Sequence, residues 1–518
     1  MIIKELFIIT SFLLAECLCA RILAIASHPS YSHNLFFRPI WKKLADKGHD
    51  LTVLTTDPME STYPRIREID LHYVYEKKSQ IRSLDWKSAR WLTILQTYFR
   101  MFKEVAEAEL DHPEVQSLLK NKSESFDLVI CELHMPVMFG FAHRFGCPLI
   151  GISSTDVLTD QHSALGNPTH PLTFTDAFMP IRDLTFPSRT DAAFWMVYNY
   201  IRSCKEDYFL LGNLVEREKM QQYFGSDVPP PLTLLRNISL VFLNTHPLFD
   251  SRPLSPKFVR IGGGIPTRYP KPLPYEMSTF LDDNPQGVIY FSLGTTIMIE
   301  QYPEHFLNVT LETFKDLPYA VLWKFDHHIP GLPKNVRIFQ WVPQRDLLAH
   351  RNVKVFLTQG GVHSIEEAIH AGVPMVGIPF VSDQARNVDN AVSKGIALCL
   401  DKNTITKRTL TRAIMEVVGN KQYRERIDAI SRLIRDAPMD VLEKVVWWTE
   451  FVLRNPQVGS ILQNGNLDVP LYQYFFLDVL AVLVCILMGL IILTRWMIFT
   501  FLRVVRLLTS WLVKKKVE

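Results

Sequence analysis

Cysteine is scarce in this chain, which has only seven among 518 residues. Three of them lie in apolar segments near the two ends: Cys17, Cys19 and Cys485. The other four belong to the body of the chain: Cys131, Cys147, Cys204 and Cys399. Because none of these four forms a C-x-x-C pair, the spacing predicts neither a disulfide framework nor a zinc site.

An excess of charge of one sign is also missing. The chain has 56 Lys and Arg against 53 Asp and Glu, a net charge of +3, and 47% of its residues are hydrophobic. This balance excludes a disordered chain and a strongly nucleic-acid-binding one. The length predicts two or three domains, each able to bury a core.

The first 20 residues have the parts of a cleavable secretory signal. Lys4 precedes an apolar run from Leu6 to Leu14, and small and thiol residues follow up to Ala20. Such an order is typical of a signal peptide over residues 1–20. The alternative is a buried first strand, but a strand pattern with clearer boundaries begins at Arg21.

A long apolar run near the other end predicts a membrane span. Residues 474–494 make 21 residues, about the length that crosses the hydrocarbon core as a helix. A buried globular helix is the alternative. The basic residues lie on the C-terminal side of this run, in the tail 495–518, so that side is expected to be cytoplasmic and the body extracytoplasmic. Within the tail, residues 496–513 fit either an interfacial helix or an extension of the span.

The last residues carry a pattern that indicates an address. Lys515 and Lys516 stand four and three places from the C-terminus, which resembles the dilysine retrieval signal of endoplasmic-reticulum membrane proteins. A plain basic flank of the span is the alternative. Three Asn-x-Ser/Thr sequons fit a lumenal body but add little in a chain this long: Asn121, Asn237 and Asn308.

The body reads as two α/β halves, 21–245 and 246–455. In the first, an apolar run at 22–26, a polar loop with His28 and His33, an amphipathic stretch at 36–45 and a second apolar run at 51–54 predict a βαβ unit. Further strands are expected at 128–131, 148–152 and 240–243, with helices at 135–145 and 192–224.

The second half repeats this alternation. Its strands are expected at 288–293, 320–324, 336–339, 353–357 and 375–378. Both halves therefore suggest doubly wound parallel sheets. Ligands of such sheets bind beyond the carboxyl ends of the strands, so the loops after Ala26, Cys131, Leu293, Phe339 and Leu357 are where chemistry is expected.

A glycine pair in the second half marks one such loop. Gln359, Gly360 and Gly361 follow a predicted strand and precede a helix, so backbone N–H groups and a helix N-terminus face whatever docks there. This arrangement favours an anion such as a phosphate. Taken alone it is a weak signal, and Ser364 with Glu367 also fits a plain capping box.

The surrounding motifs are far more specific. Trp341-Val-Pro-Gln344, Gln359-Gly360-Gly361-Val-His-Ser364-Ile-Glu-Glu367 and Asp383-Gln384 follow one another at fixed spacing over more than forty residues. This segment closely resembles the signature of the UDP-glycosyltransferase family. Ser32-His33, Lys47-Gly48-His49-Asp50, Gly166-Asn167-Pro168 and Phe291 to Thr295 extend the resemblance, and the C-terminal anchor matches the membrane-bound animal members. The resemblance implies the GT-B fold, in which two Rossmann-like domains face each other. The acceptor would bind to the domain over 21–245, and the UDP-sugar to the domain over 246–455, which would include a return helix.

The same resemblance implies roles for a set of donor-site residues. Trp341 would stack on the uracil, Gln344 would contact the uridine, and Glu367 would accept hydrogen bonds from the ribose hydroxyls. The diphosphate would meet Ser292, Thr295, Gln359, Gly360, Gly361 and Ser364. The hydroxyls of the transferred sugar would meet Asp383 and Gln384.

His33 matches the family's catalytic base, and Glu132 falls at the position of its usual aspartate. Histidine has a suitable pKa for removing a proton from an acceptor hydroxyl, and a carboxylate would orient it. His28 lacks the motif position. Two departures from the pattern stand out: many members have His at position 359 and Asp at position 132. Both variants look like those of arthropod members.

These observations lead to an expected function with two alternatives. The first hypothesis is an inverting transferase that moves a hexose, glucose before glucuronic acid, from a UDP-sugar to a hydroxyl of a small lipophilic acceptor, as in conjugation and detoxification. The alternatives are a non-catalytic membrane-anchored binder of lipophilic molecules and a receptor, whose tail of about 24 residues is too short for a folded domain.

The expected partners follow from the first hypothesis. They are the UDP-sugar, which is a co-substrate and not a cofactor, the acceptor, and an endoplasmic-reticulum membrane crossed once. Homo- or hetero-association is common in the membrane-bound family. No nucleic acid is expected. No metal ion is expected either, because the sequence lacks the Asp-x-Asp motif of the other large glycosyltransferase fold.

Overall fold

The computed structural model describes residues 19–78, 91–169, 174, 189–190, 193–194, 217–263, 270–295, 297, 302–381, 383–463, 471–474 and 476–515. Almost all of the predicted signal peptide, residues 1–20, lies outside this range. The same holds for most of the helix expected at 192–224, of which α9 (Arg217–Phe224) is described.

The N-terminal half is built on a parallel sheet of seven strands, in the order β3-β2-β1-β4-β5-β6-β7. The strands are β1 (Arg21–Ala26), β2 (Asp50–Thr55), β3 (Ile66–Asp70), β4 (Leu128–Glu132), β5 (Leu149–Ser153), β6 (Leu240–Leu243) and β7 (Phe258–Arg260). The helical segments of this half are α2 (Tyr31–Asp46), η1 (His72–Lys78), α4 (Trp91–Asp111), α5 (Pro113–Lys120), η2 (Pro136–Phe139), α6 (Gly140–Phe145), α7 (Thr159–Ala164), α9 and α10 (Pro231–Arg236). The strand order reverses between β1 and β4, which is where doubly wound sheets bind ligands.

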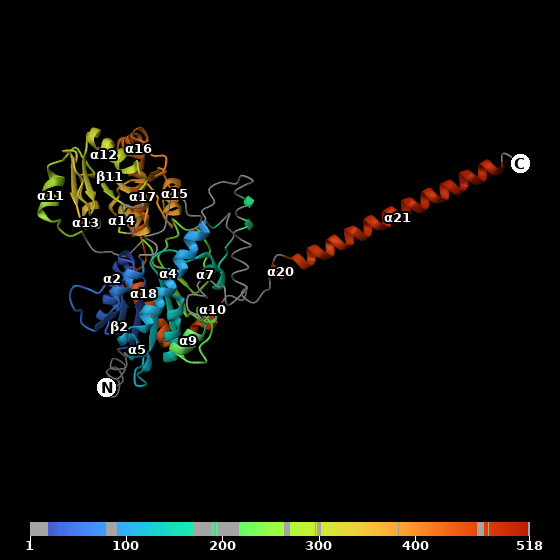
Figure 1. Cartoon of the computed structure of the whole chain (residues 1–518), viewed down its shortest axis with the longest axis horizontal. Helices are drawn as coiled ribbons and strands as arrows, with labels where there is room; N and C mark the ends of the chain where they lie inside the picture. The colour runs from blue at the N-terminus through green and yellow to red at the C-terminus, as the bar shows by residue number, and fades with distance from the viewer. Residues whose placement is uncertain are drawn as a thin grey trace, which may run out of the picture. The chain divides into compact units, whose positions relative to one another are not determined.

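The C-terminal half has a parallel sheet of six strands, in the order β10-β9-β8-β11-β12-β13. The strands are β8 (Val288–Ser292), β9 (Ala320–Lys324), β10 (Val336–Phe339), β11 (Val353–Thr358), β12 (Met375–Gly377) and β13 (Ala397–Cys399). Its helices are α11 (Tyr275–Asp282), α12 (Phe306–Asp316), α13 (Gln344–Leu348), α14 (Val362–Ala371), α15 (Gln384–Ser393), α16 (Lys407–Gly419) and α17 (Lys421–Arg435). Here the order reverses between β8 and β11. Figure 1 shows the two halves as separate groups of strands and helices.

The start of α2 differs from the sequence-based expectation. The polar residues before Phe36 were expected to form a loop, but α2 already begins at Tyr31. Ser30 is extended and its carbonyl accepts the backbone N–H of His33 at 3.1 Å. His33 therefore lies in the first turn of a helix and not in a loop.

The helix expected at 135–145 is divided into η2 and α6. Pro136 starts the first segment, where its missing N–H costs nothing. Gly140 starts the second, and a Cβ atom there would lie 2.4 Å from the ring of Phe224. Glycine at this position leaves room for α9 to pack against the start of α6. The division of the expected helix into two segments therefore depends on a contact between parts of the chain that are far apart in the sequence.

Two segments after residue 245 belong to the N-terminal half. Strand β7 pairs with β6, so the N-terminal sheet continues past the expected boundary at 245/246. Helix α18 (Val441–Arg454) packs on α2, and its Val445 and Val446 join the core cluster that contains Ile22. In Figure 1, α18 lies among the elements of the N-terminal half. The short α19 (Val458–Ile461) follows it.

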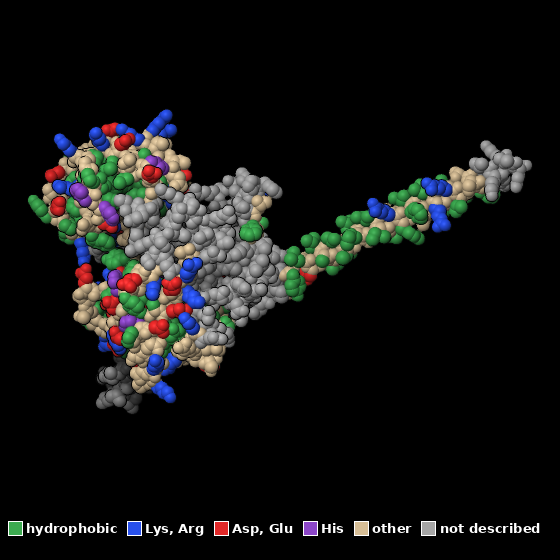
Figure 2. All heavy atoms as spheres, viewed as in Figure 1, with side chains coloured by type: hydrophobic (Ala, Val, Ile, Leu, Met, Phe, Trp, Pro, Cys, Tyr) green, Lys and Arg blue, Asp and Glu red, His purple; other side chains and the backbone are tan. Residues whose placement is uncertain are grey.

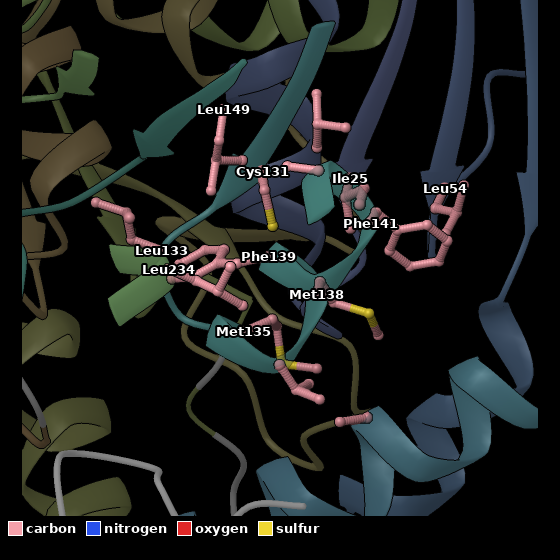
Figure 3. Packing of buried hydrophobic residues seen from close by; sticks show 14 of the residues in the cluster. Ile25, Leu54, Cys131, Leu133, Met135, Met138, Phe139, Phe141, Leu149 and Leu234 are labelled. Carbon is pink, nitrogen blue, oxygen red and sulfur yellow. The ribbon is translucent and has the colours of Figure 1, made fainter. Parts of the chain in front are cut away.

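The face of the N-terminal sheet that carries Ile25 and Leu54 buries a large apolar cluster (Figure 3). Cys131 of β4 and Phe139 of η2 belong to the same cluster, and both are fully buried. Close packing of this kind fixes the carboxyl end of β4, where Glu132 follows Cys131 as the last residue of the strand.

The residues from 464 onward form a unit of their own. It contains α20 (Leu471–Tyr474) and the long helix α21 (Leu477–Lys515). Within the described residues, one helix is long and apolar enough to cross a membrane, over Leu477–Leu512. Figure 2 shows hydrophobic side chains along α21, interrupted by Lys and Arg. The helix covers most of the expected span, 474–494, and continues without a break through most of the expected tail, 495–518.

Candidate active site

The carboxyl ends of β1 and β4 bring two side chains of opposite character together. His33, in the first turn of α2, places its Nδ1 atom 2.5 Å from Oε1 of Glu132. The Glu132 side chain is 1% exposed and that of His33 is 13% exposed. Because a carboxylate only accepts hydrogen bonds, Nδ1 carries the proton and the lone pair is on Nε2. The pair can therefore work as a base with its orienting carboxylate.

The surroundings keep Glu132 ionised. Burial alone would raise the pKa of Glu132, but the adjacent His33 imidazole, together with His134 and His28, holds that pKa well below its usual range. A second buried carboxyl group, Glu109 of α4, accepts a hydrogen bond from the hydroxyl of Ser27 at 2.8 Å. Burial raises the pKa of Glu109 well above its usual value. The pKa values of these two nearby carboxyl groups are thus shifted in opposite directions, and Glu132 is the one held as an anion.

The histidines around Glu132 form a compact cluster. Nδ1 of His134 lies 3.5 Å from Oε1 of Glu132. The His28 ring lies 4.9 Å from the His33 ring and 5.8 Å from the His134 ring, measured between centroids. His28 therefore belongs to this cluster, although it lacks the motif position that His33 has. Ligand-type atoms of His33, Glu132 and His134 all lie within 4.8 Å of one another, a group that could hold a metal ion. The hydrogen bond from His33 to Glu132 uses the same atoms.

The carboxyl ends of β8 and β11 place the predicted diphosphate residues side by side. Ser292 ends β8, is 2% exposed, and its hydroxyl accepts the N–H of Gly294 at 3.2 Å. A Cβ atom on Gly294, whose φ is +73°, would lie 2.2 Å from Nε2 of Gln359. The Gln359 amide therefore packs directly on this turn. Thr295, the next residue along the chain, is exposed.

The turn after β11 requires its glycines. Gly360 has a φ of +87°, and a Cβ atom there would lie 2.3 Å from Val388. Gly361 is the residue before the ten-residue helix α14, which follows β11, and β11 pairs with β8, the strand that ends at Ser292. A helix N-terminus with small, tightly turned residues suits an anion, as the sequence predicted.

A hydrogen-bond network joins three of the predicted donor residues. Nε2 of Gln344 donates to Oε2 of Glu367 at 2.8 Å and to the Ser364 hydroxyl at 3.1 Å. Oε1 of Gln344 accepts the hydroxyl of Tyr290 at 2.9 Å. The buried Tyr290 was not singled out from the sequence, because its strand pattern marked it as ordinary core. It fixes the orientation of the Gln344 amide.

Trp341 remains available for a stacking partner. Its ring is 51% exposed, and the edge of the Tyr31 ring contacts it at 5.4 Å between centroids. Lys324, at the end of β9, lies 6.0 Å from the centre of the Trp341 ring, and its Nζ donates to the carbonyl of Gly294 at 2.9 Å. Lys324 was missed because a lysine that ends a strand has no distinctive sequence pattern.

Asp383 and Gln384 begin α15. Oε1 of Gln384 accepts the backbone N–H groups of Phe380 and Val381 at 2.8 and 3.0 Å. Oδ2 of Asp383 accepts Nδ2 of Asn387 at 2.8 Å, and the same nitrogen contacts the carbonyl of Gly360 at 3.2 Å. The first turn of α15 is thereby tied to the glycine turn.

His363 joins the two halves beside these residues. Its ring stacks on Phe36 of α2 at 5.1 Å, and its Nε2 lies 3.0 Å from the carbonyl of Ser154. Burial, with a smaller contribution from the nearby His33, lowers the pKa of His363 to about 4. His363 lies within the sequence motif that contains Gly361 and Ser364. That position could have identified it as a residue of the site. The structure therefore packs α2, which carries His33, against α14, which carries Ser364 and Glu367.

Glu366, on α14, leads to a prediction about stability. Its Oε1 accepts the N–H of Gly263 at 3.0 Å and its Oε2 accepts Nδ2 of Asn244 at 3.3 Å. Burial raises the pKa of Glu366 to about 7 from the ordinary 4.5. A raised folded-state pKa gives stability that is complete below the unfolded pKa and is lost as pH rises through about 7.

Glu366→Gln should therefore raise the melting temperature relative to the parent protein at pH 8 but not at pH 5. The difference in unfolding free energy between the two pH values is expected to be about 2 kcal/mol. Thermal denaturation at both pH values checks it, with the exposed Glu425→Gln of α17 as control. An effect of Glu366→Gln that is the same at both pH values would contradict the prediction.

Comparison with known proteins groups this chain with transferases. Residues 20–509 match the family described as UDP-glucoronosyl and UDP-glucosyl transferase. The chain is 34% identical to UDP-glucosyltransferase 2 of Dactylopius coccus over 477 residues, 90% of each chain. It is 31% identical to the ecdysteroid UDP-glucosyltransferase of Spodoptera littoralis nuclear polyhedrosis virus, over 92% of this chain and 96% of that one. UDP-glucuronosyltransferase 2B7 of Homo sapiens is 28% identical over 97% of each chain.

Solved structures share the fold. The calicheamicin glycosyltransferase superposes with a TM-score of 0.56 at 17% identity, covering 84% of this chain and 98% of that one. The glycosyltransferase of kitacinnamycin gives a TM-score of 0.55 at 18% identity, over 83% of this chain and 98% of that one. The expected GT-B architecture, two parallel sheets with their helices, is confirmed.

Proposed function

The chain belongs to the UDP-glycosyltransferase family, and we propose that it transfers glucose from UDP-glucose to a hydroxyl group of a small lipophilic acceptor, with inversion at the anomeric carbon. The observation that carries this proposal is the buried pair of His33 and Glu132, in which His33 lies on a helix, α2, that packs through Phe36 on His363 of α14. Conjugation of lipophilic compounds is the role that this reaction would serve.

In this proposal, the donor is held by the C-terminal half. Trp341 stacks on the uracil, and Gln344 and Glu367 meet the uridine, with Glu367 accepting from the ribose hydroxyls. The diphosphate lies at the N-terminus of α14, among Ser292, Thr295, Gln359, Gly360, Gly361 and Ser364. Gln359 has no charge, and Lys324 supplies a positive charge close to this turn. The positive end of the helix and these donors stabilise the leaving UDP.

The transfer itself is a single displacement. Nε2 of His33 takes the proton of the acceptor hydroxyl as the acceptor oxygen bonds to the anomeric carbon. The bond from that carbon to the phosphate oxygen breaks, and UDP leaves with the bonding electrons. Glu132 keeps the proton on Nδ1 of His33 and stabilises the imidazolium that forms. No step needs a group other than these side chains and the two substrates.

The charges near the proposed sugar position support a neutral hexose. Three carboxylates stabilise the positive charge of Arg386 of α15: Asp156, Asp250 and Asp383. The positive charges in this group are Arg386 and Arg252. The carboxylate of glucuronic acid would add to an excess of negative charge, whereas glucose adds none.

A membrane location is part of the proposal. The apolar helix within α21 would cross the bilayer once, with the body in the lumen of the endoplasmic reticulum and the basic end in the cytoplasm. Lipophilic acceptors partition into membranes, so an anchored enzyme meets them at raised concentration. Protease protection of Lys514 to Glu518 in sealed microsomes tests the orientation, because a cytoplasmic tail is cleaved without detergent.

Sugar choice is tested by comparing donors. Membranes containing the protein are supplied with one phenolic acceptor and either UDP-glucose or UDP-glucuronic acid, and the glycoside is identified by mass and by its anomeric proton coupling. We expect the β-glucoside, at a kcat/KM at least about tenfold above that for the glucuronide. Preference for UDP-glucuronic acid would reject glucose as the donor sugar, and an α-glucoside would reject inversion.

Trp341→Ala should weaken UDP binding by about 10- to 100-fold, because stacking of a base on an aromatic ring contributes about 1–3 kcal/mol. Calorimetric titration with UDP measures the change. Trp447→Ala is the matched control, since Trp447 is 45% exposed but lies on α18. Equal affinity of both variants for UDP would remove Trp341 from the uracil site.

A further inference from the structure

A buried ion pair crosses between the two halves beside the proposed sugar position. NH1 of Arg386, in the first turn of α15, lies 2.6 Å from Oδ2 of Asp156, which follows β5. The side chains are 14% and 1% exposed and stand 230 residues apart in the sequence. Both line one pocket together with Asp383 and Asn387.

The N-terminal half holds Asp156 in a fixed orientation. Its Oδ1 accepts Nε2–H of His162 at 2.9 Å and the backbone N–H of Val157 at 3.0 Å. Nδ1 of His162 in turn accepts Nδ2 of Asn167 at 2.9 Å, and Oδ1 of Asn167 accepts the N–H of Ser255 at 2.6 Å. The backbone N–H of Ser255 can only donate, so Oδ1 of Asn167 accepts and Nδ2 of Asn167 donates to Nδ1 of His162. His162 is therefore the neutral tautomer with its proton on Nε2.

The charges of this group agree with that assignment. Burial would raise the pKa of Asp156, but His162, Arg386 and Arg252 lower it far below its usual range. Burial is the main cause that lowers the pKa of His162, and the charge of Arg252 adds to it. Asp156 is thus an anion beside a neutral imidazole, and Arg386 balances its charge from the other half.

The C-terminal partner is connected to the sugar and phosphate residues. Arg386 follows Gln384 by two positions, and Asn387 joins Asp383 to the carbonyl of Gly360. Any movement of the first turn of α15 therefore moves the two residues proposed to meet the sugar. The ion pair holds that turn against the half that carries His33.

We propose that Arg386 and Asp156 are a pair of positioning residues that set the transferred hexose in register with His33. A buried ion pair adds little to stability, because desolvation of both charges offsets their attraction. The ion pair instead constrains geometry, because the two side chains meet only when α15 lies at a particular distance from the end of β5. This inference rests on the proposed function, because it takes Asp383 and Gln384 as the sugar contacts.

The pair should act on the sugar and not on the nucleotide. The proposed contacts of uracil and ribose are Trp341, Gln344 and Glu367, and the last two are hydrogen-bonded to each other away from the Arg386–Asp156 contact. Loss of the pair should therefore leave UDP affinity within about threefold of the parent value. It should lower kcat/KM for UDP-glucose by at least about 30-fold, which corresponds to the loss of one partner of a buried ion pair.

The experiment compares Arg386→Gln, Asp156→Asn, the double variant and Arg386→Lys in the full-length protein. For each, calorimetry gives the UDP affinity and product formation gives kcat and KM for UDP-glucose. Arg424→Gln is the control, because Arg424 is half exposed and pairs with Asp428 within α17. The expected result is a selective loss with UDP-glucose in both single variants, a double variant no worse than the poorer single one, and partial recovery in Arg386→Lys.

Several outcomes would overturn the proposal. Equal losses for UDP and UDP-glucose, or additive losses in the double variant, would mean that the pair only supports the fold. If Arg386→Gln fails to fold, Arg386→Lys and Asp156→Asn decide by the same comparison, and parent-like kinetics in both would reject the pair. Absence of transfer by the parent protein is a different result, because it rejects the proposed function itself.

Discussion

Replacement of His33 by alanine is expected to lower kcat by at least about a thousandfold while UDP binds as in the parent protein. The reason is geometric. His33 is the imidazole that Glu132 orients at 2.5 Å, whereas the proposed uridine contacts lie in the other half of the protein. Product formation at saturating UDP-glucose measures kcat, and calorimetry measures the UDP affinity.

The control for this variant is His327→Ala. His327 is about half exposed and pairs with Asp326. It should retain parent-like turnover. Turnover within about tenfold of the parent value in His33→Ala would mean that another group removes the proton, and His28 and His134 would be the next candidates because their rings adjoin His33.

Replacement of Glu132 should have the second largest effect. Glu132→Gln keeps the shape of the side chain but loses the charge, so the imidazolium is no longer stabilised and the tautomer of His33 is no longer fixed. A loss of about 10³- to 10⁴-fold in kcat is expected, with the UDP affinity unchanged. Glu132→Asp keeps the charge on a shorter arm and should lose less.

The order of the variants is the test of this role. Kinetics of Glu132→Gln, Glu132→Asp and the exposed control Glu114→Gln should rank the charge-conserving variant between the other two. Full activity in Glu132→Gln would show that the carboxylate does not orient His33. Equal and complete losses in both site variants would show that the length of the arm matters as much as the charge.

The alternation of apolar runs with amphipathic stretches was enough to predict both sheets. The central strands could be recognised because parallel strands covered on both faces are continuously apolar. The short strands β3, β7 and β13 could not be recognised, because partly exposed edge strands lose that pattern. A return helix was expected from the resemblance to the family, whereas the apolar face of α18 taken by itself would fit either half.

The residues proposed to hold the donor were predicted from one dense set of motifs, and several of them contact one another in the structure. The residues that orient these side chains could not be predicted from the motifs. Tyr290 reads as core, Lys324 as the end of a strand, and Asp156 with Arg386 as two unrelated charges far apart in the chain. Each acts through one contact with a distant segment, and such contacts exist only in the folded chain.

The most direct test of the central claim is UDP release from UDP-glucose by membranes that contain this protein, over a panel of phenols, flavonoids and steroids, with His33→Ala in parallel. The proposal predicts release that requires both the protein and an acceptor and that disappears in the variant. Binding of acceptors without UDP release from UDP-glucose or any other UDP-sugar would contradict it and would indicate a non-catalytic binder. Release that is equal in His33→Ala would contradict the assignment of the base.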